Sequence, residues 1–337
     1  MGSITAASVT SVAKRAIVKD CSALEIGAST QSRILAVIVL YKSSIDRSST
    51  CISIRDQSGY DRDAFTVLVY DNSPIANSTG LPSDWMYVSD PINNGLPAAY
   101  NHAILRCKEL GAHWVLLLDQ DSRLPANFLV NLQADAALCY PQPKIAAIVP
   151  RVFSKQRQVS PFLPKFGLDR PYVVARSTTS AWLTAINSAA CIRVSFVESI
   201  GGFSRKFWLD YLDHWLFRKI YDTAHSVFVS EMRVEHDLSV ANFNEGLEVS
   251  RYRNILSAER TFTNEYLPRF WRPLLAFRLM ARAGKHIVST RNKRMASLMF
   301  HASLRQFFSI LYWNSTEDVN SDGREIASTD EGKMSAS

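Results

Sequence analysis

The sequence predicts an α/β protein with a mostly parallel, twisted sheet flanked by helices, and three observations lead to this prediction. Short apolar runs recur along the chain, helical patterns separate them, and acidic residues follow two of the runs. A short continuous apolar run suits a strand that is buried on both faces. Such runs alternating with helices indicate a doubly wound sheet. The chain has 337 residues, enough to bury a sizeable core.

Four runs rich in Val, Ile and Leu are the expected strands: 34–40, 65–70, 114–118 and 145–149. Three intervening segments with apolar residues at helical spacing are the expected helices: 44–57, 96–110 and 126–139. Residues 150–176 hold four prolines and little periodicity, so we expect a long surface excursion over the sheet edge.

The composition, with 47% apolar and 20% charged residues, is that of an ordinary folded protein. A membrane-spanning helix needs about 18 consecutive apolar residues, and no stretch of the chain approaches that length. The N-terminal 30 residues lack the apolar core of a signal peptide. Five scattered cysteines without C-x-x-C spacing argue against a disulfide framework or a zinc site. We therefore expect a cytoplasmic protein.

The net charge of +7 is unevenly distributed. Residues 266–313 hold nine Lys or Arg and no acid, whereas residues 314–337 hold six acids and two bases. The rest of the chain is nearly neutral. We expect four parts: a mobile extension (1–31), an α/β domain (32–260), a basic amphipathic helical appendage (261–313) and a disordered acidic tail (314–337).

Basic amphipathic helices can lie in a membrane interface, so residues 266–313 predict peripheral contact with the inner face of the membrane. The alternative is a helical cap that packs on the main domain and exposes a basic face. We do not expect a nucleic-acid partner, because no recognised module accompanies the basic residues.

Acidic residues at two strand ends mark the expected binding edge of the sheet. Asp71 follows the second strand, and Asp119-Gln-Asp-Ser122 follows the third. On extended backbone Asp119 and Asp121 would point to one side, where two carboxylates could hold a divalent cation on a diphosphate. The alternative is a solvated acidic turn. No Gly-x-Gly-x-x-Gly or P-loop motif is present, which disfavours dinucleotide enzymes and P-loop NTPases.

A second acidic pair, Asp210 and Asp213, is expected in the first turn of one helix. Asp210 would favour the helix N-terminus electrostatically. Asp213, with Tyr211, His214 and Trp215 around it, suits a general base in a partly apolar cleft.

Several short motifs follow one another along the chain, and their order is informative. They are Asp71-Asn-Ser73, Asn93-Asn-Gly95, Asn101, Leu116-Leu-Leu-Asp-Gln-Asp-Ser122, Gly201-Gly-Phe203, Leu209-Asp-Tyr-Leu-Asp-His-Trp215, Glu235-His-Asp237 and Arg251-Tyr-Arg-Asn-Ile255. Over roughly residues 33–260 this order resembles the inverting family 2 glycosyltransferases of the GT-A fold. The Leu-Leu-Asp-Gln-Asp-Ser run resembles the rhamnosyltransferase-like branch that builds bacterial surface polysaccharides.

The resemblance implies metal-dependent, inverting transfer of rhamnose or another hexose. The donor would be a dTDP- or UDP-linked sugar, and the acceptor a glycan or a lipid-linked molecule. Asp213 would be the catalytic base, and Asp119, Asp121 and His236 would hold Mn²⁺ or Mg²⁺. An imidazole ligand favours Mn²⁺.

The remaining implied contacts fall into two groups. The nucleotide-sugar would be bound by Tyr41, Asp71, Asn94, Gly95, Asn101, Asp119 and Gln120. The acceptor pocket would include Trp208, Tyr211 and Trp215. Trp215 departs from the rhamnosyl branch, which usually has Glu two residues after the base, so the acceptor class stays open.

Two other functions remain open from the residues. One is a nucleotidyltransferase, although Tyr41-Lys-Ser-Ser44 is a poor version of its glycine-rich basic loop. The other is a non-catalytic, membrane-associated protein that binds nucleotide sugars.

Overall fold

The computed structural model describes residues 32–164, 169–236, 249–290 and 293–321. The chain divides into two compact units between residues 241 and 242. This division lies earlier than the predicted boundary at 260/261, because helix α6 (Val249–Tyr266) shares a core with the helices that follow it. The predicted extension 1–31 lies outside the described residues.

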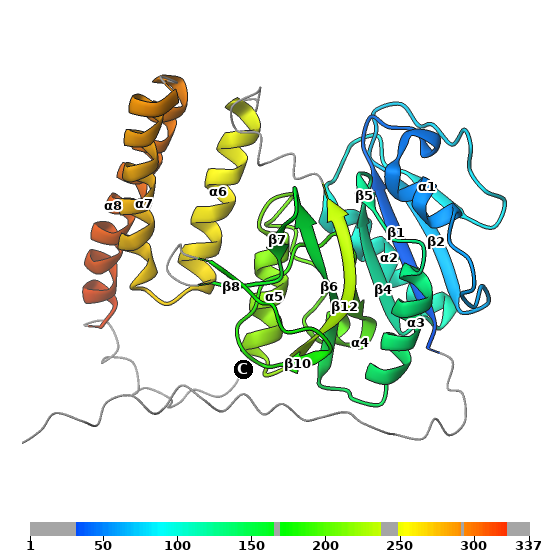
Figure 1. The fold of residues 1–337 in the computed structure, drawn as a ribbon. Coiled ribbons are helices and arrows are strands. Elements are labelled where there is room, and N and C mark those ends of the chain that lie inside the picture. Colours follow the sequence, from blue (N-terminus) through cyan, green and yellow to red (C-terminus); the bar gives the residue numbers. More distant parts are fainter. Residues whose placement is uncertain (1–31, 165–168, 237–248, 291–292, 322–337) are drawn as a thin grey trace, which may run out of the picture. The chain divides into compact units, whose positions relative to one another are not determined.

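The first unit contains a mostly parallel sheet with the strand order β10-β12-β6-β11-β4-β1-β2-β3 (Figure 1). Along this order the strands are β10 (Ser177–Thr179), β12 (Ser226–His236), β6 (Ile145–Ser154), β11 (Ala190–Arg193), β4 (Trp114–Asp119), β1 (Ile34–Leu40), β2 (Phe65–Asp71) and β3 (Met86–Ser89). Strands β4, β1, β2 and β3 run parallel, whereas β11 is antiparallel to both of its neighbours. The predicted α/β class is confirmed.

The helices of this unit are α1 (Ser49–Arg55), α2 (Leu96–Leu110), α3 (Phe128–Cys139), α4 (Val194–Ser199) and α5 (Leu212–Asp222). Helix α2 has the predicted bounds. The single helix predicted over 44–57 is instead a 3₁₀ turn (Ile45–Arg47) followed by α1. The break falls at Ser48, because its extended backbone and its hydroxyl, which accepts from Cys51 N, cap a new helix there.

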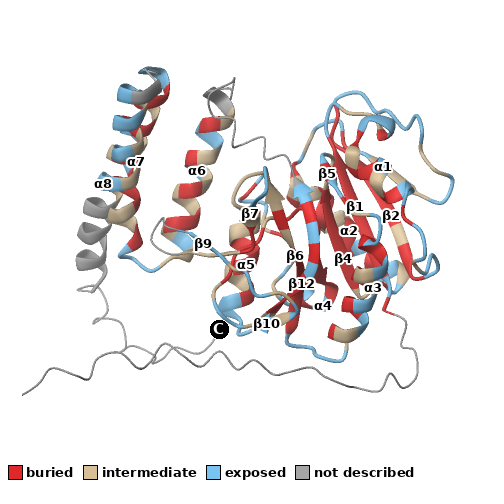
Figure 2. Ribbon diagram, viewed as in Figure 1, coloured by how far each residue is buried: buried red, intermediate tan, exposed pale blue. Residues whose placement is uncertain are grey.

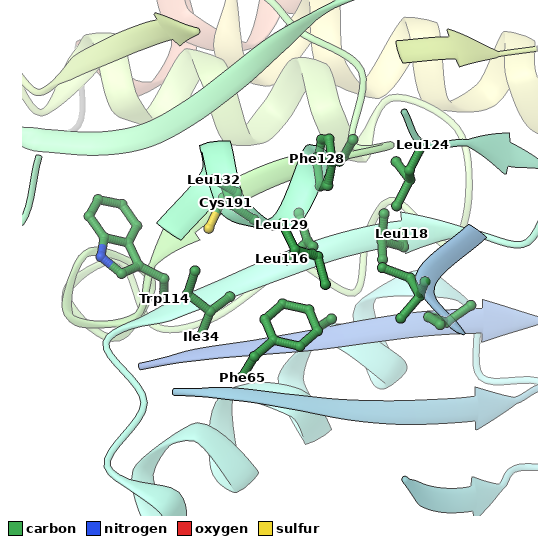
Figure 3. Close-up of a cluster of buried hydrophobic side chains, with 14 of the residues drawn as sticks. Ile34, Phe65, Trp114, Leu116, Leu118, Leu124, Phe128, Leu129, Leu132 and Cys191 are labelled. Carbon is green, nitrogen blue, oxygen red and sulfur yellow. The ribbon is translucent and has the colours of Figure 1, made fainter. Parts of the chain in front are cut away.

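The core lies between the sheet and its helices. Every residue of β1 is buried, which explains why its sequence lacks alternation (Figure 2). Figure 3 shows Trp114, Leu116 and Leu118 of β4 near Phe128 and Leu132 of α3. The four free cysteines of the described residues are all buried, as expected for small apolar side chains.

The excursion predicted over 150–176 contains strands. Strand β6 continues to Ser154 and turns into β7 (Arg157–Ser160). Short strands β8 (Phe162–Leu163) and β9 (Arg170–Pro171) form a separate two-stranded sheet. Such short edge strands carry too few residues for a periodic pattern, and prolines are tolerated in them.

The second unit contains α6, α7 (Trp271–Lys285), a π-helical turn (His286–Thr290) and α8 (Lys293–Ser321). Its core includes Tyr252 and Leu256 of α6, Leu279 of α7 and Met299 of α8. Helix α8 continues beyond residue 314, where the acidic tail was predicted to begin, and residues 322–337 lie outside the described part. Among the described helices, none combines the length and apolar character needed to cross a membrane.

Candidate functional site

The ends of four strands meet at one edge of the sheet. The register pairs Leu40 with Asp71 and Val39 with Asp119, and Asp71 with Ser89 of β3. The predicted acidic residues of β2 and β4 therefore lie at the carboxyl edge of the parallel strands, where α/β proteins bind ligands.

The segment after β4 is a tight turn. Asp119 ends the strand, Gln120 and Asp121 form the turn, and Ser122 begins the short strand β5 (Ser122–Arg123). The extended backbone expected from Asp119 to Asp121 is not found, because the chain reverses at this turn to pair β5 with β12. Asp119 is half-buried and Asp121 is exposed.

Helix α1 braces this turn from its N-terminus. The Thr50 hydroxyl accepts from Ser122 N (3.0 Å) and donates to the Asp119 carbonyl (2.5 Å). The Ser48 hydroxyl donates to the Gln120 carbonyl (2.7 Å). Sequence reasoning missed both hydroxyls, because about 70 residues separate them from the turn and no local pattern connects them.

The predicted metal ligands come from the end of β4, from the turn that follows it and from the end of β12. Strand β12 pairs with β5 so that His236 lies opposite Ser122, next to Asp121 in the chain. The His236 side chain lies outside the described residues, and the described side chains form no cluster of three or more metal ligands. Two carboxylates close together in the chain on one braced turn are the kind of oxygen ligand that a hard divalent cation takes.

Asp71 is fully buried and its carboxylate bonds within the protein. It accepts from Ser73 N (2.8 Å), the Tyr87 hydroxyl (2.6 Å) and Asn77 N (3.2 Å). Burial, together with the hydrogen bond and charge of Asp71, raises the pKa of Tyr87 to about 12. Asp71 therefore shapes the loop after β2 and presents no exposed oxygen, in contrast to the predicted nucleotide contact.

Asn94 is held by Asp90, a residue that sequence reasoning missed. The Asn94 backbone and side-chain N–H groups donate to the Asp90 carboxylate, each at 3.0 Å. Burial acts to raise the pKa of Asp90, but hydrogen bonds from Asn94, the Tyr70 hydroxyl and Ile92 outweigh it and lower the pKa. The Asp90 carboxylate thus fixes the position of Asn94, a predicted nucleotide-sugar contact.

Gly95 is required by its contact with Trp208. Its φ is +81°, and a Cβ atom there would overlap the Trp208 carbonyl and indole. Leu96 N donates to the Trp208 carbonyl (2.9 Å), and Trp208 Nε1 donates to the Asn93 carbonyl (3.0 Å). The structure therefore joins a predicted nucleotide-binding loop to a predicted acceptor residue.

Asn101 holds the glycine motif. Its Nδ2 donates to the Phe203 carbonyl (2.9 Å), and its Oδ1 accepts from Phe203 N (2.8 Å). Gly202 has a φ of +87°, and a Cβ there would approach Asn101 Oδ1 to 2.6 Å. The carboxamide predicted to bind nucleotide sugar is engaged in positioning this backbone.

Tyr41 extends from the end of β1 beside the turn after β4. Tyr41 N donates to Gln120 Oε1 (2.8 Å), and the residue is 42% exposed. Lys42 N donates to the Ser73 hydroxyl (2.8 Å), and the Lys42 ammonium lies 5.1 Å from the Tyr41 ring centroid. An exposed ring and an exposed cation at this edge suit a base and a phosphate, and Lys42 was not among the predicted site residues.

Asp213 is the second residue of α5 and is half-buried. Its Oδ1 accepts from His214 N (2.7 Å). Asp210 precedes the helix, so the prediction that both acids share the first turn is wrong. The reason is that Tyr211 caps α5 with a left-handed backbone (φ +67°), which redirects the chain before Leu212.

The predicted acceptor residues differ in exposure. Trp208 is 43% exposed and Tyr211 is half-buried, with its ring stacked on His214 at 4.7 Å. Trp215 is buried, and its Nε1 has no hydrogen-bond partner within the described part of the chain. Trp208 and Tyr211 can therefore meet a ligand directly, whereas Trp215 belongs mainly to the core.

Tyr100 of α2 is influenced by the charges of both Asp119 and Asp213. The side chain is fully buried, and among the described residues its hydroxyl has no hydrogen-bond partner. Burial, followed by the charges of Asp119 and Asp213, raises its pKa well above the ordinary value. A neutral hydroxyl thus lies within electrostatic reach of both carboxylates. Sequence reasoning missed it, since a tyrosine on the apolar face of a helix is typical of a core.

No known protein-family profile matches the chain, and no curated protein matches it. Among solved structures, GalNAc-T7 with UDP, GalNAc and Mn²⁺ is similar with a TM-score of 0.52 and 13% identity over 82% of this chain. The match spans 57% of the GalNAc-T7 chain, a little more than half of its length.

Two further structures have TM-scores below 0.5. S. aureus TarS 1–349 has a TM-score of 0.43 and 13% identity, covering 87% of this chain and 92% of that one. The mannosyltransferase PcManGT from Pyrobaculum calidifontis, in complex with GDP-Man and Mn²⁺, has 0.45 and 14%, covering 83% and 88%. The likeness to GalNAc-T7 shows the fold, which is that of the GT-A-type glycosyltransferases, as predicted.

Proposed function

We propose that the protein is a glycosyltransferase that transfers a sugar from a nucleoside-diphosphate sugar to an acceptor hydroxyl with inversion. The observation that carries the proposal is the convergence of the β1, β2 and β4 ends, with two carboxylates on the braced turn after β4. The fold shared with GalNAc-T7, whose structure holds UDP, GalNAc and Mn²⁺, supports it.

Asp119 and Asp121, together with His236, are proposed to hold Mn²⁺ or Mg²⁺. A divalent cation supplies positive charge for a diphosphate leaving group. Tyr41, Gln120, Asn94 and Gly95 would line the nucleotide-sugar at the same edge, with Tyr41 offering its exposed ring to the base. The Lys42 ammonium, exposed beside that ring, adds charge that suits the diphosphate.

Asp213 is the proposed catalytic base. Its carboxylate would accept the proton of the acceptor hydroxyl as that oxygen attacks the anomeric carbon from the face opposite the diphosphate. The product is formed in one displacement, so the reaction requires no covalent intermediate on the protein. Trp208 and Tyr211, both partly exposed beside Asp213 in the sequence, would contact the acceptor, and Trp215 would support them from the core.

The donor is proposed to be a dTDP- or UDP-linked rhamnose or other hexose, and the acceptor a glycan or lipid-linked molecule of bacterial surface polysaccharide synthesis. This finer assignment rests on the order of the motifs and on the Leu116–Ser122 run, which resemble those of the rhamnosyltransferase-like branch of family 2. The reaction would take place on the cytoplasmic side of the membrane.

Calorimetric titration with UDP, dTDP and GDP, each with and without Mn²⁺, tests donor binding. A nucleoside diphosphate that binds only with the metal, and whose sugar conjugate releases it in the presence of acceptor, supports the proposal. Preference for a nucleoside triphosphate with release of pyrophosphate would identify a nucleotidyltransferase instead. Binding of nucleotide sugars without any turnover would favour the non-catalytic binding protein.

A further inference from the structure

Helix α7 carries two apolar faces. One contains Leu275, Leu279 and Ala283, which are buried in the three-helix core of the second unit. The other carries Phe277 and Met280, which are 71% and 41% exposed. A helix that contacts its neighbours on one side and water on the other normally places polar residues on the second side.

The exposed side continues into the turn after α7. Ile287 and Val288 are both exposed, Val288 to 83%. Together with Phe277 and Met280 they form a run of exposed apolar side chains that continues from α7 into the π-helical turn, and we call these four residues the α7 face. Helix α8 shows the same property, because Phe300, Phe307 and Phe308 are exposed on it.

The three helices are joined without using the α7 face. Arg282 of α7 forms an ion pair with the buried Glu259 of α6 (2.8 Å). The Gln306 side chain of α8 donates to Asn264 of α6 (2.7 Å). The Ser303 hydroxyl of α8 donates to the Ala276 carbonyl of α7 (2.8 Å). Packing within the unit therefore does not explain the exposed apolar side chains.

The α7 face lies in a basic part of the chain. The chain between residues 266 and 313 has nine Lys or Arg and no acid. Arg278 and Lys285 adjoin the face on α7, and within the described part of the chain neither takes part in an ion pair. Basic side chains that no carboxylate neutralises attract an anionic partner.

We propose that the α7 face docks on an anionic lipid surface. Exposed phenylalanine, methionine and β-branched side chains would enter the region between headgroups and acyl chains, while Arg278 and Lys285 would meet the lipid phosphates. The helix would lie in the plane of the interface, since none of the described helices could span it. The inference rests on the second unit alone and not on the proposed enzymatic activity.

Nucleic acid fits this surface less well. It shares the phosphate charge but offers no apolar layer to cover a row of side chains such as Phe277 and Val288. A second copy of the chain would cover the apolar residues but would bring its own positive charges into contact with those of the first. Of these three partners, only the anionic lipid surface matches both the apolar side chains of the α7 face and the basic side chains beside it.

Co-sedimentation of the full chain with vesicles tests the proposal. Vesicles of phosphatidylcholine are compared with vesicles that contain 30% phosphatidylglycerol, at low and high salt. We expect binding to the anionic vesicles only, falling steeply with salt because exposed charges are screened within ~8 Å at physiological ionic strength. Arg278→Gln with Lys285→Gln should weaken binding by about tenfold or more. Phe277→Ser with Val288→Ser should weaken it by about tenfold.

Matched variants on the first unit provide the controls. Leu105→Ser removes an apolar side chain that is 59% exposed on α2, and Lys144→Gln removes an exposed charge. Neither should change vesicle binding. The substituted side chains are exposed, except that of Arg278, which is half-buried, and unchanged melting curves should show that each variant folds.

Three results would overturn the proposal. They are equal binding to neutral and anionic vesicles, no binding at all, and binding that survives loss of Phe277 and Val288. Light scattering during size-exclusion chromatography measures whether the chain self-associates. Self-association that depends on Phe277, without vesicle binding, would assign the face to a second copy.

Discussion

Asn101 and Phe203 form a reciprocal pair across 102 residues of sequence. The Asn101 carboxamide donates to the Phe203 carbonyl and accepts from its N–H, at 2.9 and 2.8 Å. The Asn101 side chain thereby bonds both backbone groups of Phe203, as the backbone of a neighbouring β-strand does. This contact fixes α2 against the Gly201-Gly202-Phe203 segment that leads to Trp208 and α5. This amide therefore adds to the contacts of Asp90 with Asn94 and of Trp208 with Asn93 that hold this part of the site together.

Replacing Asn101 by Ala should destabilise the first unit by about 1–3 kcal/mol, because two partly buried backbone groups of Phe203 lose their partners. The measurement is the urea midpoint at an unchanged slope of the transition. Asn101→Asp is the sharper variant, since it keeps an acceptor for Phe203 N but loses the donor to the Phe203 carbonyl. Stability equal to that of the wild type in both variants would contradict the positioning role.

Two buried tyrosines should respond oppositely to loss of the hydroxyl. Tyr70→Phe removes a donor to Asp90 (3.2 Å) and should cost about 0.5–1.5 kcal/mol. Tyr100→Phe removes a buried hydroxyl without a hydrogen-bond partner in the described structure, so stability should stay equal or rise. Thermal melts of the two variants check this contrast. A large loss for Tyr100→Phe would reveal a structural partner for that hydroxyl, such as a buried water.

Asp213→Asn keeps the shape of the side chain but removes the proton acceptor. Turnover should fall by about 10²–10⁴-fold, with donor affinity nearly unchanged. Asp210→Asn is the matched control, three residues away and outside α5, and it should retain most of the turnover. Single-turnover kinetics with the donor identified by titration would measure both. A dead Asp210→Asn beside an active Asp213→Asn would reverse the assignment.

Asp121→Asn should weaken Mn²⁺-dependent binding of the nucleoside diphosphate without unfolding the protein, because Asp121 is exposed on the turn after β4. Calorimetry with and without Mn²⁺ gives the metal-dependent part directly. Asp84→Asn, an exposed acid away from the turn, is the control. Unchanged metal dependence in Asp121→Asn would remove this residue from the proposed metal site.

Asp90 predicts a pH dependence of stability. Its pKa is lowered in the folded state, so its contribution is present above the ordinary aspartate value of about 3.9 and is lost as the pH falls through the folded value. The free energy of unfolding of the wild type should therefore fall more steeply than that of Asp90→Asn as the pH is lowered below about 4. Parallel pH profiles for the two proteins would show that Asn94 and Tyr70 do not favour the charged form.

The sequence determined the elements whose burial is written in a local pattern. Strand β1 is recognisable because all seven of its residues are apolar and buried, and α2 because its apolar face begins after Gly95 and ends before Gly111. The same patterns brought Asp71 and Asp119 to the carboxyl edge of the sheet. The order of the short motifs then indicated the GT-A fold, which the likeness to GalNAc-T7 confirms.

Only the tertiary structure decided what most of these side chains do. Asp71 is buried by Tyr87 and the loop after β2, Asn101 is engaged by Phe203, and Thr50 of helix α1 braces Asp119 at the end of β4. Each contact joins positions from 16 to 102 residues apart in the chain, so neither helical nor strand periodicity contains it. A carboxylate or amide has the same local sequence whether it binds a ligand or a distant backbone. Its role depends on whether the tertiary structure buries the polar group and on which hydrogen-bond partners lie beside it.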